Sequence, residues 1–413
     1  GSFHRAIATI GQPEPGTPQA DLYQLARLGL QADAIREEAR EAMERGDNKS
    51  AEALYEKART MLDKVHPWQG AQAVFMVAAA RHMLGKRAEA QSLLNPHIEK
   101  LKAQGESFAL LDLLSLQADL EALIGNLAAK KAHTARSIAI CEAEDNYYCL
   151  ANQHDTHGRA LLHDGRLGDA KKHLELAEKY ADLVGYERLV LNARGSLADL
   201  HLSNGNLPET RRLADELLIK ARKMRDAYNE RFALMLLGAA ALDSGDGKLA
   251  VRYFGDVYEL GVRIGDNWVR ALARLFEGKA QLHALHDPAA AEPLLQQAAD
   301  LYGALLDVDG RARCLIDLAV AQTERKHFGD ARLALREATK VAQLTGRKPL
   351  LASAYAKLAQ LELDAGQPAA ALPAAQSATD LAQTLDIMGS RWPAWHVMAN
   401  ALDRNGKPDD AFA

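Results

Sequence analysis

Residues 158–185 read GRALLHDGRLGDAKKHLELAEKYADLVG. Apolar and small residues recur at helical spacing before Gly165, and a second helical pattern begins at Leu167 and runs to Val184. Gly165 and Gly185 each follow the last residues of a pattern, where a helix ends most readily because glycine adopts a positive φ without strain. The stretch therefore predicts two antiparallel helices joined by a short turn.

The turn glycine recurs at intervals of about forty residues along the chain. Its copies are Gly46, Gly85, Gly125, Gly165, Gly205, Gly245, Gly366 and Gly406. Two further copies fit the remaining interval, with Leu285 or His286 and then Lys326 in the glycine position. A fixed period of this length is the sequence signature of a repeat array. We therefore predict an all-α fold, a right-handed superhelical solenoid of about ten antiparallel helix–turn–helix units.

Small residues occupy fixed positions on either side of each turn. Seven residues before the turn, all ten copies have alanine or glycine, and five residues after it eight of the ten have alanine. Positions that admit only small side chains are those where two helices approach closely. In these positions the chain resembles the tetratricopeptide repeat (TPR) family, in a long variant with forty residues in place of the roughly 34 that are usual.

The repeat also predicts the organisation of the chain. Residues 1–19 are rich in Pro and Gly and begin with Gly-Ser, which is typical of a linker and a tag remnant. Residues 20–413 form the TPR-like array, with turns near residues 46, 85, 125, 165, 205, 245, 286, 326, 366 and 406. The last repeat stops shortly after its turn, and we expect the natural protein to continue beyond it.

Composition narrows the class of protein. Hydrophobic residues make up 48% of the 413, enough for a continuous core, and the formal net charge is −5. No stretch concentrates Lys and Arg as a nucleic-acid surface requires, and no apolar run is long enough to span a membrane. Three cysteines in no CxxC pattern favour a reducing, cytoplasmic location. Cys141 and Cys149 are expected to be two separate thiols, with a disulfide between them as the alternative.

The family resemblance implies a concave groove lined by the first helix of each unit. The third to fifth units would present polar and charged side chains there, and the sixth to eighth units would present apolar ones. The residues predicted to bind a partner are Asp112, Asp119, Asn152, Asp155, Arg159, Asn192, Asp199, Phe232, Met235, Leu272 and Leu275. Asn152 and Asn192 would hydrogen-bond the backbone of an extended peptide, and the apolar half would hold its side chains.

Two other interpretations of these residues remain open. The charged residues that occupy one position in consecutive units, such as Asp119, Arg159 and Asp199, would pair with one another, while Phe232 and Met235 would belong to the core. The second alternative is a small ligand in the groove. Trp392 and Trp395, in the last unit, are expected to pack within the array, with a partner contact as the alternative.

No catalytic or metal-binding constellation stands out. His154 and His157 share a helix face, as a metal-binding pair would, but the segment has neither an HExxH motif nor a cysteine, so we expect no metal and no cofactor. The prediction is a non-catalytic scaffold or sensor that binds a peptide or protein and belongs to a larger bacterial regulatory protein. The alternatives are the substrate-recruiting arm of an enzyme, such as a CHAT-type protease, a cyclase or a kinase, and a self-assembling array that associates through its ends.

Overall fold

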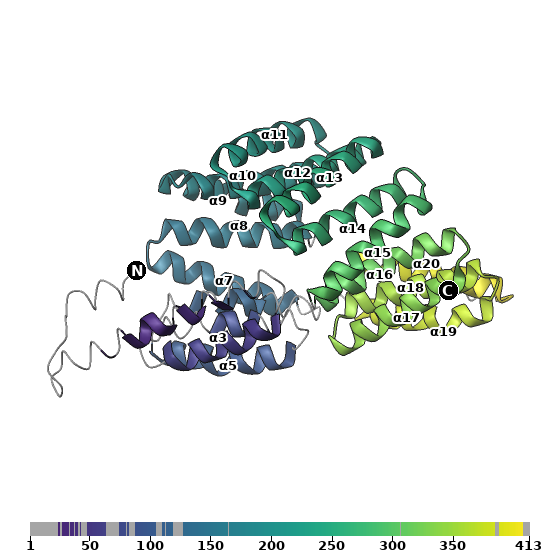
Figure 1. Cartoon of the computed structure of the whole chain (residues 1–413), viewed down its shortest axis with the longest axis horizontal. Helices are drawn as coiled ribbons and strands as arrows, with labels where there is room; N and C mark the ends of the chain where they lie inside the picture. The colour runs from purple at the N-terminus through teal and green to yellow at the C-terminus, as the bar shows by residue number, and fades with distance from the viewer. Residues whose placement is uncertain are drawn as a thin grey trace. The chain divides into compact units, whose positions relative to one another are not determined.

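The structure is a computed structural model, and the description covers residues 48–62, 74–79, 87–104, 113–118, 127–163, 165–305, 307–384 and 388–407 with isolated positions before and between them. Its helices are α3 (Asn48–Leu62), α5 (Arg87–Gln104), α7 (Leu127–Ala143), α8 (Tyr147–His163), α9 (Leu167–Val184), α10 (Glu187–Ser203), α11 (Leu207–Met224), α12 (Ala227–Asp243), α13 (Gly247–Ile264), α14 (Asn267–His283), α15 (Pro288–Ala304), α16 (Val308–Glu324), α17 (Phe328–Leu344), α18 (Lys348–Asp364), α19 (Pro368–Gln383) and α20 (Met388–Arg404). Consecutive helices pack as antiparallel pairs (Figure 1). The predicted all-α solenoid is confirmed.

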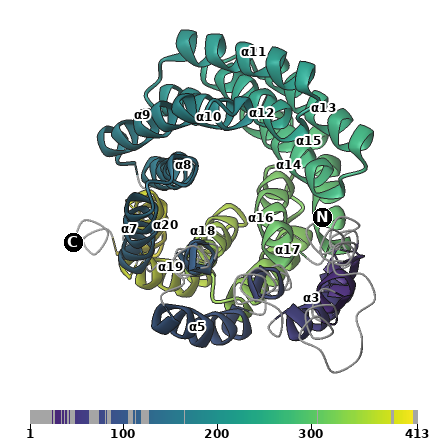
Figure 2. The same cartoon turned by 90° about the vertical axis from the view of Figure 1, so that its left-hand side faces the viewer.

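The chain divides into two compact units. The first comprises residues 1–122, 128–140 and 305–307, and the second comprises residues 123–127, 141–304 and 308–413. In the first unit, α5 contributes Leu94, Ile98 and Leu101 to a buried apolar cluster. In the second unit, from α8 to α14, helices α8, α10, α12 and α14 form an inner layer, while α9, α11 and α13 form an outer layer (Figure 2).

The turns between paired helices share one backbone conformation. Gly165, Gly205, Gly245, Gly366 and Gly406 all have a φ between 71° and 80°. In the two units without a turn glycine, His286 (φ 53°) and Lys326 (φ 63°) adopt the same left-handed conformation, so His286 rather than Leu285 holds the seventh position. The predicted turns at residues 46, 85 and 125 lie outside the described residues. The left-handed turn is therefore present even in the two units whose turn residue has a Cβ atom, which makes this backbone conformation less favourable than it is for glycine.

The small residues of the first helix are close-contact positions. A Cβ atom added to Gly158 would lie 2.5 Å from the Leu174 side chain, and one added to Gly238 would lie 2.5 Å from the ring of Phe254. Ala198, Ala319 and other alanines of this position are fully buried. A large apolar side chain of the second helix thus occupies the space beside a glycine or alanine of the first helix. This close packing fixes the distance between the two helices of each pair.

Aspartates cap three consecutive helices of the second unit. Asp226, Asp246 and Asp266 precede α12, α13 and α14, and each carboxylate accepts a hydrogen bond from the backbone N–H three residues ahead. A cap of this kind contributes about 1 kcal/mol, because it satisfies a donor that has no partner within its helix.

The expectation about the cysteines was wrong in one respect. Cys141, near the end of α7, and Cys149, in the first turn of α8, form a disulfide across the short connection between these helices. Separate thiols were expected because three cysteines, an odd number with no CxxC pair, do not suggest a disulfide framework. The helix–helix connection brings the two Cα atoms to 5.6 Å, so the alternative of a disulfide is the one found. Cys314 is a buried free thiol.

Candidate partner-binding surface

The inner layer of the second unit brings together side chains from helices that are two repeats apart. Arg159 on α8 reaches past α10, and its Nη1 donates a hydrogen bond of 3.5 Å to the hydroxyl of Tyr228 on α12. The Arg159 guanidinium also lies 5.9 Å from the ring centroid of Phe232. Side chains of alternate units approach one another in this way only on the inner side of the curved array, so these residues identify the concave face.

Gly195 on α10 leaves room for the Phe232 ring beside this contact. A Cβ atom at Gly195 would lie 2.8 Å from the Phe232 ring and 3.1 Å from Leu217, so the ring occupies a notch that only glycine leaves open. Phe232 is half-buried and packs against Leu236 and Ala198. The predicted partner contact at Phe232 is thus also a packing contact.

An arginine held between two aromatic rings lies beside this contact. The Arg231 guanidinium is 5.2 Å from the ring centroid of Tyr228 and 5.5 Å from that of Trp268 on α14. Tyr228 and Trp268 remain 39% and 37% exposed. Arg231 itself is half-buried, and within the part of the chain that the structure describes it forms no ion pair. Burial, followed by the nearby Arg159 charge, lowers its pKa from the ordinary value of arginine, although Tyr228 and Asp266 oppose this shift.

Two carboxylates lie on the α8 and α10 side of the same face. Asp155 Oδ2 is 4.0 Å from Arg159 Nη1, and its Oδ1 atom is buried without a hydrogen-bond partner. Burial raises the pKa of Asp155, while Ser196 and Arg159 act in the opposite direction. Asp199 interacts electrostatically with Arg159. Asp155 and Asp199 therefore both lie close to Arg159. Of the alternative in which charges of consecutive units pair, only the interaction of Arg159 with Asp199 can be followed, because Asp119 lies outside the described residues.

The predicted asparagine pair has other partners. Asn192 accepts a hydrogen bond of 2.9 Å from the buried Asn229, and Asn152 donates one of 3.1 Å to the backbone carbonyl of Tyr148. Asn229 also donates to Asp226, the cap of α12. Asn192 Nδ2 has no acceptor among the described residues and remains the amide group best placed to contact a ligand.

The predicted apolar half of the surface is mostly core. Leu275 is only 6% exposed, and Met235 packs against the buried clusters that join α12 to α13 and α14. Leu272 is half-buried. Asp112 and Asp119 lie outside the described residues. We refer below to one set of residues as the inner surface: Asp155, Arg159, Asn192, Asp199, Tyr228, Arg231, Phe232 and Trp268.

Three members of this site, Tyr228, Arg231 and Trp268, were not among the predicted residues. The forty-residue period contained the signal for two of them, since Tyr228 and Trp268 occupy one position in consecutive units, and Tyr148 occupies it two units before Tyr228. They were missed because this position lies in the first turn of each helix, before the positions that the family resemblance places in the groove.

Solved structures with a similar architecture identify the fold. One is a Rap protein complexed with Competence and Sporulation Factor, which has a TM-score of 0.55 and 13% identity, over 93% of this chain and 95% of that one. Another is a Signal Transduction ATPase with Numerous Domains (STAND) protein with a tetratricopeptide repeat sensor, from Pyrococcus horikoshii, which has a TM-score of 0.54 and 16% identity, over 98% and 69% of the respective chains.

The fold is a TPR-like helical repeat array. No family model and no curated protein matches the sequence. Among the described helices of the TPR-like array, none combines the length and apolar character needed to cross a membrane.

A histidine cluster lies between α8 and α9 of the array. His154 Nδ1 is 2.9 Å from His173 Nδ1, and the His157 ring packs edge-on against His173 at 4.3 Å between ring centroids. His154 is buried and stacks on Tyr180. Among the described residues, neither these histidines nor any other group of three or more His, Cys, Asp or Glu side chains is arranged so that it could hold a metal ion. Burial, and then proximity to His173, lower the pKa of His154 to about 4.

This shift makes the array sensitive to acid. An unfolded chain protonates His154 near the ordinary pKa of 6.5, whereas the folded array does so only near 4, so the unfolded state binds more protons between these values. We expect the free energy of unfolding to be highest above pH 6.5 and to fall by about 2–3 kcal/mol between pH 6.5 and pH 4.5 from this group alone. Urea unfolding of wild type and His154→Leu at both pH values measures it. The variant should lose this part of the pH dependence, and an unchanged dependence would contradict the assignment to His154.

The expectation for the last unit was wrong. Trp392 is 72% exposed and Trp395 is 44% exposed, and Trp392 stacks on His396 along the surface of α20. The buried positions of this helix are instead filled by Ala394, Val397 and Ala401, because α20 packs through a face of small residues. The two tryptophans therefore do not fill the core.

Proposed function

We propose that the inner surface binds an extended segment of a partner protein, and that this segment carries an acidic side chain that pairs with Arg231. The observation that carries the proposal is the state of Arg231, a half-buried cation between Tyr228 and Trp268 with no ion pair among the described residues. On this account the array is a non-catalytic sensor or scaffold.

The environment of Arg231 favours an anion from outside the chain. The Tyr228 and Trp268 rings stabilise the nearby positive charge, and a guanidinium offers five N–H donors that an aromatic ring does not satisfy. A carboxylate that approaches these donors would form charge-assisted hydrogen bonds in partly dehydrated surroundings, where they are stronger than in water. Tyr228 and Trp268 would be covered by the same segment, and Trp, Tyr and Arg are the residue types that contribute most to binding energy at interfaces.

The polar side of the inner surface suits the backbone of such a segment. Asn192 Nδ2 can donate to a carbonyl, and Asp155 and Asp199 can accept from backbone N–H groups or from a cationic side chain. Arg159 stands between these groups and Tyr228, so that the negative and positive parts of the surface adjoin. A segment with an acidic residue toward α14 and a polar or basic residue toward α8 would match this order of charges.

The structural neighbours are compatible with the proposal. One of them is complexed with Competence and Sporulation Factor, and the other is described as a tetratricopeptide repeat sensor of a signal transduction ATPase. At 13% and 16% identity these structures are evidence for the fold alone, and what they bind is not transferred to this chain. The proposal for this chain depends on its own residues.

A peptide selection tests the proposed function. A displayed library of random twelve-residue peptides is selected on the whole chain, with the double variant Arg231→Met/Trp268→Ala as the counter-target. We expect enriched peptides that bind wild type but not the double variant, and that contain Asp or Glu at one preferred position. Peptides that bind both proteins equally, or a selection that enriches none, would contradict the proposal.

A further inference from the structure

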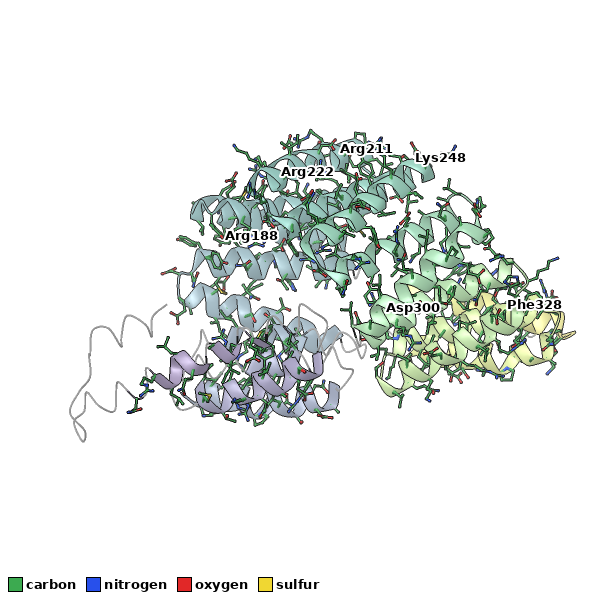
Figure 3. The ribbon with its side chains drawn as sticks, viewed as in Figure 1. Arg188, Arg211, Arg222, Lys248, Asp300 and Phe328 are labelled. Carbon is green, nitrogen blue, oxygen red and sulfur yellow. A yellow bond between two sulfur atoms is a disulfide. The ribbon has the colours of Figure 1, made fainter. Side chains whose placement is uncertain are left out.

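An open pocket of about 430 Å³ lies within the second unit, where the C-terminal ends of α11 and α13 meet the N-terminal end of α12. It is lined chiefly by three arginines, one glutamate and two apolar residues, namely Arg222, Arg225, Arg263, Glu230, Leu260 and Ile264. Figure 3 shows Arg222 at this end of the helices, together with Arg188, whereas Arg211 and Lys248 lie toward the other end. The volume is within the range of sites that hold small ligands.

Glu230 holds two of the arginines in place. Its Oε1 accepts a hydrogen bond of 3.0 Å from Arg222 Nε, and its Oε2 accepts one of 2.6 Å from Arg263 Nη2. The Glu230 side chain is only 7% exposed, while those of Arg222 and Arg263 are 54% and 62% exposed. Each guanidinium is thus fixed through one of its nitrogens and keeps further N–H donors that face the open pocket.

Arg225 adds a third guanidinium from an unusual backbone position. It ends α11 in the left-handed conformation, with φ 53° and ψ 36°. The equivalent residues of the flanking units are Gly185 and Gly265, with φ 68° and 70°, for which this conformation carries no strain. An arginine therefore occupies a position that favours glycine, and the same arginine lines the pocket. A side chain retained at a strained position is a reason to look for a function.

The charges of the pocket do not balance. Glu230 neutralises one of the three arginines, and Asp226, the nearest other carboxylate on α12, pairs with Arg188 at 3.0 Å. Arg225 forms no ion pair with any described residue. Basic residues at the end of a helix often do no more than offset the helix dipole. That explanation applies to all three arginines, but the C-terminal ends of α11 and α13 together amount to only about one negative charge, so the pocket keeps an excess of positive charge.

We infer that this pocket binds a small phosphate monoester. A phosphate group carries close to two negative charges at neutral pH and offers three acceptor oxygens, which matches the excess of charge and the three guanidiniums. Its organic part would rest against Leu260 and Ile264, the apolar side of the pocket. The pocket lies at the same end of α12 as Tyr228 and Arg231 of the inner surface, but it is lined by other residues, on α11, α12 and α13. The inference does not depend on the proposed function.

The variant Arg225→Gly tests the inference cleanly. Glycine is the residue of both flanking units at this position, so the variant should fold and be at least as stable as wild type. Binding of phenyl phosphate to the whole chain is measured by titration calorimetry at constant ionic strength, beside inorganic phosphate and phenol. We expect phenyl phosphate to bind more tightly than inorganic phosphate, phenol not to bind, and Arg225→Gly to weaken phenyl phosphate at least tenfold.

A matched control removes a cation that lies outside the pocket. Lys223→Ala deletes an exposed positive charge two residues from Arg225 and should leave the affinity for phenyl phosphate within about twofold of wild type, since it changes only the long-range field. The inference is overturned if phenyl phosphate does not bind, if it binds wild type and Arg225→Gly equally, or if Lys223→Ala weakens it as much as Arg225→Gly does.

Discussion

Replacing Arg231 with methionine should weaken the binding of a selected acidic peptide by a factor of about ten to a hundred. The substitution keeps an unbranched side chain between the rings of Tyr228 and Trp268 but removes the positive charge and its hydrogen-bond donors. A hydrogen bond to a charged group contributes about 1.5–3 kcal/mol, which corresponds to this range. Fluorescence anisotropy with a labelled peptide measures the change.

Two comparisons make this result specific. Arg212→Met removes an arginine of α11 that pairs with Glu209 and Glu216, and it should leave the affinity unchanged. A peptide whose acidic residue is changed to the corresponding amide should bind wild type weakly and should lose little more on Arg231→Met. If the acidic and amide peptides responded alike to the variant, Arg231 would not pair with a carboxylate.

Replacing Phe254 with alanine should lower the free energy of unfolding by about 3–5 kcal/mol, which is the usual cost of removing a fully buried aromatic ring. Phe254 is completely buried on α13, its ring fills the space beside Gly238, and it lies 5.6 Å from the ring of Phe276. The backbone glycine opposite cannot fill the cavity, so the site should relax little.

Urea unfolding followed by circular dichroism gives this value. Ile219→Ala is the matched control, because Ile219 is 69% exposed on the outer layer and its loss should cost less than about 0.5 kcal/mol. A loss below about 1 kcal/mol for Phe254→Ala would show that the Gly238–Phe254 contact does not hold the helix pair together.

The sequence predicts the fold well because the fold depends on a period. Each repeat needs a left-handed turn and small residues where its helices touch, and these requirements recur at fixed positions such as Gly165 and Gly158. In the seventh unit the turn has the same backbone conformation as the others but no glycine, so the sequence located it only to within one residue, at Leu285 or His286. The Cys141–Cys149 disulfide was held only as an alternative, because it depends on one connection rather than on the repeat.

The site was predicted only in part, because it depends on how far the array curves. The period placed Arg159, Asp155 and Asp199 on one face, but it could not show that Arg159 reaches Tyr228 across α10. Nor could it show that the Phe232 ring, which lies beside Arg159, occupies the space that the missing side chain of Gly195 leaves. Likewise, Arg225 was not singled out from the sequence, and only the structure places it with Arg222, Arg263 and Glu230 in one pocket.

The central claim is that partners bind on the inner surface, and photocrosslinking tests it most directly. A selected acidic peptide with a benzophenone next to its acidic residue is irradiated with the whole chain, and the modified residues are identified by mass spectrometry. The account predicts attachment to α12 and α14 near Arg231 and Trp268, and its loss when unlabelled peptide is added in excess. Attachment that is equally competed but maps to the outer helices α9, α11 and α13 would contradict it.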